Sequence, residues 1–337
     1  MKKILILTVF FISCLVTAQF NKTAPWMTDS QNGEELTVHP ANILFEQYWS
    51  THDKKAKGSG YKPFMRWLES RKNDVNPDGR LMSASQLWSA YNQKNARKTN
   101  KTNNLFNTPV CNWQPVGPHT ITTNGSWSTG QGRVNVVCVD PNDPNVIYIG
   151  APGGGIWKSI NSGSSWTPLA DNLPQIGVSG IAIDPNNSNI IYIATGDNDA
   201  SVTTSIGVMK SIDGGLTWNT TGLNSGNTPS DMCNIIINPN DTNMIWVATS
   251  SGIFKSVDAG TTFLNVKTGS FSQGSIRLKP NDPSIMYATN SNGFYKSTNY
   301  GTSFATLTSG LSGASGRRLL DVTAANPEVV YVFSSGN

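Results

Sequence analysis

Three carboxylates in the second half of the chain are of the residue type that glycosidic-bond hydrolysis uses. Asp197, Asn198 and Asp199 lie in the polar segment 195–206, and Asp231 follows it. Two carboxyl groups at roughly 5–9.5 Å can serve as general acid and as base or nucleophile on a glycosidic bond. Asp197 or Asp199, paired with Asp231, are therefore the candidate catalytic residues.

Three arginines each precede an aliphatic segment and are candidates for binding: Arg133, Arg317 and Arg318. The planar guanidinium donates several hydrogen bonds to carboxylates and hydroxyls. With Asp197, Asn198 and Asp199 they form the candidate ligand-binding set. A solvated loop that holds Ca²⁺ is the alternative for the two aspartates, and we expect no other metal and no cofactor.

A repeat that begins at Gly132 must position these residues. An aliphatic segment, in most copies a Pro-Asn turn, and then a segment centred on an aromatic recur five times. The aromatics are Tyr148, Tyr192, Trp246, Tyr287 and Tyr331, at intervals of 44, 54, 41 and 44 residues. Short strands with this period are typical of β-propeller blades.

A shorter motif ends the third strand of four copies: KSINSGSSW, KSIDGGLTW, KSVDAGTTF and KSTNYGTSF. We expect its Asp or Asn to close a turn, its Gly to take a positive φ, and its last aromatic to pack into the blade. Two copies carry Asn, which cannot act as a general base, so the motif has a structural role. Its residues are Ser159, Asn161, Gly163 and Trp166; Ser211, Asp213, Gly215 and Trp218; Ser256, Asp258, Gly260 and Phe263; and Ser297, Asn299, Gly301 and Phe304.

Together the four copies resemble the Asp-box, or BNR repeat, SxDxGxTW. Asp-box β-propellers include sialidases, family-74 xyloglucan hydrolases, the sortilin luminal domain and photosystem assembly factors. The resemblance covers about residues 113–337 and implies a mainly β fold. We expect an incomplete Asp-box β-propeller of about four and a half blades, preceded by a small α-helical segment. The helical segment followed by blades also resembles large exported proteins that carry a type IX sorting domain.

The N-terminus predicts export. Lys2 and Lys3 precede the apolar run 4–16, and small residues stand before Gln19, which indicates a signal peptide over residues 1–18. The protein is then secreted or lies on the outer cell surface, without a transmembrane segment; lipidation of Cys14 is the alternative. Cys111, Cys138 and Cys233 match no zinc or redox spacing, so we expect small buried hydrophobic residues.

Residues 19–91 predict a helical segment, 92–110 a polar linker and 111–337 the propeller. Aromatic stripes at helical spacing run through 44–52 and 64–71, and Ser83 with Gln86 predicts a capping box for a third helix. The segment is basic, but its lysines are dispersed and no recognition motif is present, so we expect no nucleic-acid partner.

The repeats indicate an incomplete ring. Residues 334–337 align with 250–252 of an earlier copy, before the motif-bearing strand, and 112–116 resemble a strand that follows the motif. We expect these sheets to pack with the remainder of their own propeller beyond residue 337. The whole propeller would then have six to eight blades. Arg277 and Asp321 share one repeat position in adjacent copies, as a channel-facing ion pair or as two solvated charges.

The expected function is non-catalytic recognition of a polysaccharide or protein at or outside the cell surface. The four segments from anchor aromatic to the lysine of the motif span 10, 18, 9 and 9 residues, so the second copy carries the long loop with Asp197 and Asp199. Long loops on rigid scaffolds are where binding concentrates. The alternative is a glycoside hydrolase, xyloglucanase-like rather than sialidase-like, because the usual arginine motif of sialidases is missing.

Overall fold

The computed structural model describes residues 38–55, 60–72, 75–99, 132–199, 203–224, 226, 228–271, 274–307 and 317–334. The expected signal peptide, Cys14, Cys111, the strand at 112–116 and the linker from residue 100 lie outside these residues. The chain divides into two compact units, Met1–Met82 and Ser83–Asn337. No helix in the described parts is long and apolar enough to cross a bilayer.

Two helices make up the described part of the first unit, α1 (Val38–Ser50) and α2 (Tyr61–Arg71). The aromatic stripes of the two helices pack together, with the rings of Phe45 and Phe64 stacked at 4.0 Å. Trp49 and Trp67 are buried in the same cluster. The aromatic residues of this segment therefore form its core.

The third helix, α3 (Ala84–Thr99), belongs to the second unit. It begins with a capping box in which the Ser83 N–H donates to Gln86 Oε1 (2.8 Å) and the Gln86 N–H donates to Ser83 Oγ (3.3 Å). The indole N–H of Trp88 donates to the carbonyl of Ile206 (3.4 Å). The structure differs from our linker boundary, because residues 92–99 continue the helix. Gln, Lys, Ala and Arg are good helix formers, so polarity here does not mean loop.

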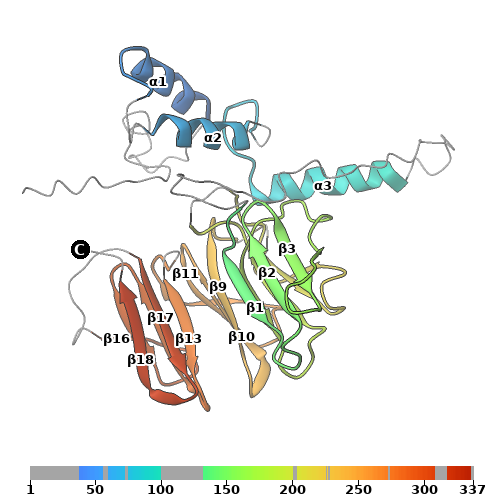
Figure 1. Ribbon diagram of the computed structural model, residues 1–337, viewed down its shortest axis with the longest axis vertical. Coiled ribbons are helices and arrows are strands. Elements are labelled where there is room, and N and C mark those ends of the chain that lie inside the picture. The colour runs from blue at the N-terminus through green and yellow to red at the C-terminus, as the bar shows by residue number, and fades with distance from the viewer. Residues whose placement is uncertain are drawn as a thin grey trace, which may run out of the picture. The chain divides into compact units, whose positions relative to one another are not determined.

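Five antiparallel sheets follow in chain order, as the colour gradient of Figure 1 shows. Four have four strands in meander order: β1 (Val136–Val139), β2 (Ile147–Ala151), β3 (Gly155–Ser159), β4 (Thr167–Pro168); β5 (Val178–Ile183), β6 (Ile191–Thr195), β7 (Val208–Ser211), β8 (Asn219–Thr220); β9 (Met232–Asn238), β10 (Asp241–Thr249), β11 (Gly252–Ser256), β12 (Leu264–Thr268); β13 (Ser275–Lys279), β14 (Asp282–Asn290), β15 (Gly293–Ser297), β16 (Ala305–Leu307). The fifth holds β17 (Arg318–Thr323) and β18 (Asn326–Ser334).

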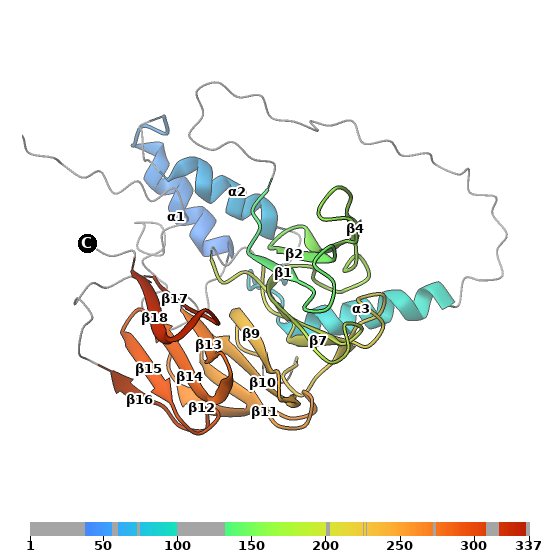
Figure 2. The ribbon, with the colours of Figure 1, turned by 60° about the horizontal axis from the view of Figure 1, so that its bottom comes forward.

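The first strands of successive sheets contact one another, β1 with β5, β5 with β9, β9 with β13 and β13 with β17. They are therefore the innermost strands, and the sheets fan out from them like blades (Figure 2). The fold is a β-propeller architecture with a small helical segment before it, which confirms the predicted fold class.

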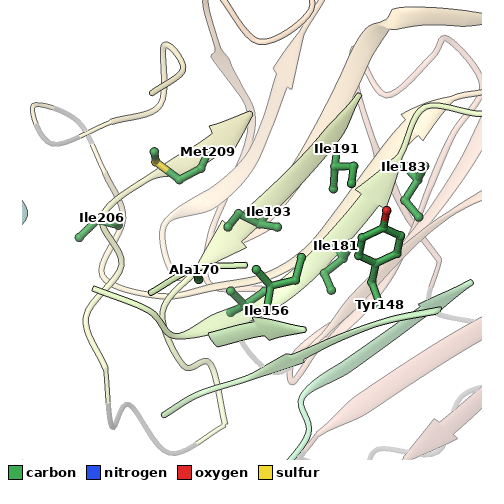
Figure 3. Close-up of a cluster of buried hydrophobic side chains, with 10 residues drawn as sticks. Tyr148, Ile156, Ala170, Ile181, Ile183, Ile191, Ile193, Ile206 and Met209 are labelled. Carbon is green, nitrogen blue, oxygen red and sulfur yellow. The ribbon is translucent and has the colours of Figure 1, made fainter. Parts of the chain in front are cut away.

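Three interfaces between neighbouring sheets each join an aromatic to aliphatic side chains. Tyr148 of β2 is fully buried in one cluster with Ile181 and Ile183 of β5 (Figure 3). Tyr192 packs in the same way with Ile235, and Trp246 with Ile276. Removing such a large side chain from water contributes about 2–3 kcal/mol, and the repeat provides one anchor for each sheet.

The repeated turn after the third strand is fastened by side chains. Ser211 Oγ donates to Asp213 Oδ1 (2.7 Å) and accepts the Gly215 N–H (2.8 Å), while Asp213 Oδ1 accepts the Thr217 N–H (2.9 Å). Gly215 has φ 96°, and a Cβ there would lie 2.6 Å from a methyl carbon of Leu169. The turn therefore needs a short acceptor at position 213 and glycine at 215.

Asn161 occupies the equivalent place in the first sheet and makes the equivalent bonds. Its Oδ1 accepts the Ser165 N–H (2.8 Å), and Ser159 Oγ donates to it (3.0 Å). An amide thus closes the turn with the same two hydrogen bonds as a carboxylate, so closure of the turn does not require an acid group.

We predict that the two turns that contain aspartate stabilise the fold in a pH-dependent way. Hydrogen bonds, first from the Thr217 hydroxyl, lower the pKa of Asp213 from 3.8 to about 2, and the Thr262 hydroxyl does the same for Asp258. A carboxyl with a depressed folded-state pKa stabilises the fold above its unfolded pKa, and this stabilisation is lost as pH falls through the folded pKa. As pH falls from about 4 to about 2, protonation of Asp213 and Asp258 should therefore lower the free energy of unfolding of the wild-type protein.

The measurement is urea unfolding at several pH values for wild type and the double variant Asp213→Asn, Asp258→Asn. The difference in unfolding free energy should be largest near pH 5 and shrink toward pH 2, because the amides do not titrate. A difference that stays constant over this range would contradict the assignment.

The two described cysteines are free. Burial raises the pKa of Cys138 to about 11 and that of Cys233 to about 12. Both thiols stay protonated near neutral pH and are poor nucleophiles or metal ligands. Cys233 is buried in the core, as predicted, whereas Cys138 is only partly buried.

Candidate functional site

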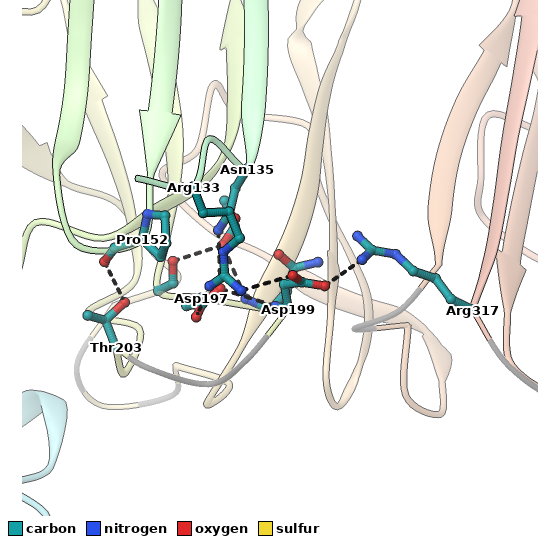
Figure 4. Close-up of polar contacts among 10 residues, drawn as sticks. Arg133, Asn135, Pro152, Asp197, Asp199, Thr203 and Arg317 are labelled. Atoms are coloured by element: carbon teal, nitrogen blue, oxygen red, sulfur yellow. Dashed lines mark hydrogen bonds and ion pairs between the residues drawn. The ribbon is translucent and has the colours of Figure 1, made fainter. Parts of the chain in front are cut away.

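One end of the sheets gathers the charged residues that the sequence singled out. Because the strands are antiparallel, the start of each first strand and the end of the second strand lie at the same end of a sheet. Arg133 precedes β1, Asp197 and Asp199 follow β6, and Arg317 precedes β17. Figure 4 shows these side chains pointing toward one another. The turns that follow the third strands lie at the opposite end.

Asp197 is the buried centre of this group, with a side chain that is 0% exposed. Its Oδ2 accepts from Arg133 Nη2 at 2.5 Å. Its Oδ1 accepts from Asn135 Nδ2 and from the Asp199 N–H, each at 3.2 Å. A buried carboxylate is stable only when paired and hydrogen-bonded, and here each oxygen faces a donor.

Asp199 bridges two arginines. Its Oδ2 accepts from Arg133 Nη1 at 2.9 Å and its Oδ1 from Arg317 Nη1 at 2.5 Å. The side chains of Asp199, Arg133 and Arg317 are 21%, 33% and 39% exposed. Arg317 immediately precedes the fifth sheet and Asp199 lies in a loop of the second, so this contact spans the array and requires the sheets to curve around a common axis.

The loop that carries Asp197 and Asp199 is held by backbone and hydroxyl contacts. The Asp197 N–H donates to the Thr203 carbonyl (3.0 Å), and Thr203 Oγ1 donates to the Pro152 carbonyl of the first sheet (3.1 Å). Ser179 Oγ donates to the carbonyl of Gly196 (2.8 Å). The described ends of the loop are therefore fixed to two sheets, and the two carboxylates are positioned before any ligand arrives.

The group of Arg133, Asp197, Asp199 and Arg317, called the ion-pair network below, is balanced in charge. A guanidinium offers only donors, and so do an amide NH₂ and a backbone N–H. All four carboxylate oxygens face such donors, so each oxygen accepts at least one hydrogen bond in this arrangement. A Ca²⁺ ion at these carboxylates would have to displace the arginines.

The remaining sequence candidates lie at the same end of the sheets, next to the residues described above. Asp231 lies at the start of β9, where its Oδ2 accepts from Ser230 Oγ (3.1 Å). Arg318 begins β17 and is 6% exposed, and its carbonyl accepts from Thr289 Oγ1 (2.8 Å). The N–H of Asn198 donates to Ser179 Oγ (3.3 Å).

Arg277 and Asp321 form a second ion pair on the innermost strands β13 and β17, at 3.1 Å between Nε and Oδ1. The side chains are 36% and 74% exposed. Arg277 Nη1 also donates to Asn234 Oδ1 (3.1 Å). The two charges at this repeat position therefore form an ion pair and are also exposed to solvent. The pair provides a matched, exposed comparison for the ion-pair network.

A small cavity lies between α3 and the loop after β4. Its volume is about 240 Å³, and Leu87, Tyr91, Lys94, Asp171 and Leu173 contribute to its wall. The wall combines an aromatic ring with groups of both charges. The cavity is far in sequence from the network residues and holds none of the predicted site residues.

Comparison with known proteins agrees with the architecture. No protein-family model matches the chain, and no curated protein matches it. Among solved structures, an ancestral family-74 glycoside hydrolase (GH74) is 24% identical with a TM-score of 0.52, covering 66% of this chain and 29% of that one. The GH74 enzyme of Niastella koreensis is 21% identical with a TM-score of 0.47, covering 61% and 33%.

A structure described as YCF48 bound to D1 peptide is 12% identical with a TM-score of 0.46, covering 61% of this chain and 63% of that one. The likeness to the ancestral enzyme shows a shared β-propeller fold. The chain spans less than a third of that enzyme's length.

Proposed function

We propose that this protein is an exported Asp-box β-propeller, sortilin-like or GH74-like in architecture, that recognises a polysaccharide without hydrolysing it. An extracellular protein is the alternative ligand. Export rests on the signal peptide over residues 1–18, and the Asp-box assignment on the four turn motifs. The partly exposed end of the sheets that carries the ion-pair network is the proposed binding face.

The occupation of both candidate carboxylates by arginine carries this proposal. A general acid has to present a proton to the glycosidic oxygen. Asp197 is fully buried and Asp199 is bound by two guanidinium groups, so neither has an oxygen turned to a substrate as a proton donor. Asp231 would be without either expected partner for the two-carboxylate mechanism.

Recognition of a polysaccharide requires hydrogen-bonding groups at the surface, and the ion-pair network is partly exposed. The side chains of Arg133, Arg317 and Asp199 are each partly exposed and bonded to one another, which brings guanidinium and carboxylate groups together at the surface. Each sugar hydroxyl both donates and accepts, so a face that offers guanidinium and carboxylate groups together matches a polysaccharide. Arg318 and Asn198 hold the backbone next to this face through hydrogen bonds. The Arg318 carbonyl accepts from Thr289, and the Asn198 N–H donates to Ser179.

Binding to a glycan array by the full-length protein tests the proposal. Arg317→Ala should weaken the best glycan signal by about tenfold or more, because a hydrogen bond to a charged group is worth about 1.5–3 kcal/mol. Arg277→Ala, which removes an exposed arginine of the other ion pair, is the matched control and should bind normally. Equal binding by both variants, or binding to no glycan, would contradict the proposed face.

A further inference from the structure

The cavity between α3 and the loop after β4 takes no part in the proposed binding face. Its wall combines one side of the helix with one connecting loop, and consists of Leu87, Ala90, Tyr91, Lys94 and Asn95 from α3 and residues 171–174 from the loop. The loop leads into β5, so it lies at the same end of the sheets as the ion-pair network.

Both walls of the cavity are anchored to the protein core. Leu87 and Leu173 pack against the hydrophobic cluster of the first two sheets. The indole N–H of Trp88, next to Leu87 on the helix, donates to the Ile206 carbonyl (3.4 Å), and the Leu173 N–H donates to the carbonyl of the buried Ala170 (2.9 Å). The cavity is therefore formed before a ligand arrives, which lowers the entropy cost of binding.

The polar side chains of the wall are available to a ligand. Within the part of the chain that the structure describes, the side chains of Lys94, Asn95, Asp171 and Asn172 form no hydrogen bond or ion pair with another residue. Lys94 and Asp171 are also exposed. Four polar groups thus surround one small space without satisfying one another.

The chemistry of the wall favours a small uncharged ligand with several hydroxyl groups. The Lys94 ammonium offers only donors and the Asp171 carboxylate only acceptors, while the two amides offer both. The two charges cancel, so the wall favours neither an anion nor a cation. Tyr91, Leu87 and Leu173 add apolar surface. A sugar ring matches this combination, because it carries hydroxyls around its edge and C–H groups on its faces.

The volume limits the ligand to about one ring. The cavity measures about 240 Å³, whereas sites for drug-sized ligands measure about 300–1,000 Å³. An amino acid would also fit by size and could pair with Lys94 and Asp171, but it has no hydroxyls around a ring for the amides of Asn95 and Asn172.

We propose that this cavity binds one uncharged sugar unit, either free or at an end or branch of a glycan. The proposal rests in part on the proposed function, since it adds a second sugar-binding site at the end of the sheets that carries the ion-pair network. The two sites have separate residues, so each can be removed without the other.

Titration of the full-length protein with the methyl glycosides of glucose, galactose, mannose and xylose, read by saturation-transfer NMR, tests the proposal. At least one should bind, and Lys94→Ala and Asp171→Ala should each weaken its binding by about tenfold or more, because each removes a hydrogen bond to a charged group. Arg97→Ala is the matched control, since Arg97 is a basic, exposed residue of the same helix outside the wall. It should change the affinity by less than about twofold. All three variants change exposed side chains and should keep the melting temperature within about 1 °C.

Arg317→Ala distinguishes the two sites. It should bind the methyl glycoside normally even where its binding to the glycan array is lost. Binding of none of the four glycosides, or equal affinities for Lys94→Ala, Asp171→Ala and Arg97→Ala, would overturn the cavity proposal and leave the proposed face intact. Binding of glycine, lost in Lys94→Ala and Asp171→Ala, by a protein that binds none of the glycosides would assign the cavity to amino acids and would also overturn it.

Discussion

Replacing Arg133 by alanine is expected to lower the free energy of unfolding by about 3 kcal/mol. Arg133 bonds both Asp197 and Asp199, and the Asp197 side chain is fully buried. Without the guanidinium, the buried carboxylate of Asp197 loses its charged partner Arg133 and keeps the hydrogen bonds from the amide of Asn135 and the Asp199 N–H. The expected value lies at the lower end for a broken buried pair, since a third of the Arg133 side chain reaches solvent.

The control for this loss is a double-mutant cycle read by urea denaturation. Asp197→Asn in the Arg133→Ala background should recover about 2 kcal/mol, because the amide oxygen still accepts from Asn135 and no buried charge remains. Arg277→Ala breaks an exposed pair with Asp321 and should cost less than about 1 kcal/mol. If Arg133→Ala costs no more than Arg277→Ala, the network does not hold Asp197 in place.

Trp246→Ala is expected to destabilise the protein by about 4 kcal/mol. Trp246 is fully buried between the third and fourth sheets, in one cluster with Ile276 and Met286. A Cβ on Gly301 would lie 2.5 Å from its indole nitrogen, which shows how closely the next sheet packs on the ring. Thermal or urea unfolding of the variant measures the loss.

Trp246→Tyr is the matched control, because tyrosine is the anchor in other sheets. Tyr192 donates its hydroxyl proton to the carbonyl of Ala259 in the next sheet (3.0 Å), and Tyr300 holds the position of Ala259 one sheet later. The tyrosine variant should therefore lose less than about 1.5 kcal/mol. A similar loss for alanine and tyrosine would mean that the anchor is not an interchangeable part of the repeat.

The fold could be predicted from the sequence because residues that recur in every repeat mark the positions of the strands. Each Pro-Asn turn marks where a first strand ends, and each anchor aromatic marks the middle of a second strand. The structure has strands at all of these places, from Val136 to Ser334. The extent of α3 did not follow, since residues 92–99 have helix-forming side chains but few apolar ones, and apolar periodicity was the signal in use.

Only part of the candidate site could be predicted from the sequence. Asp197, Asp199 and Arg133 stood out by type and by the long loop, but their mutual pairing did not. Arg317 lies 118 residues from Asp199, and closeness across a curved array is a property of the whole fold. Asn135 was missed altogether. Its signal is a polar residue at a repeat position where the third sheet has Cys233, a buried hydrophobic residue.

Release of reducing sugar ends from plant or algal glucans by the full-length protein is the most direct test of recognition without hydrolysis. We expect release no faster than in the enzyme-free blank, for glucans that the protein binds on the array. Sugar release by wild type that disappears in Asp197→Ala or Asp231→Ala, with both variants still folded, would contradict the account and establish a glycoside hydrolase.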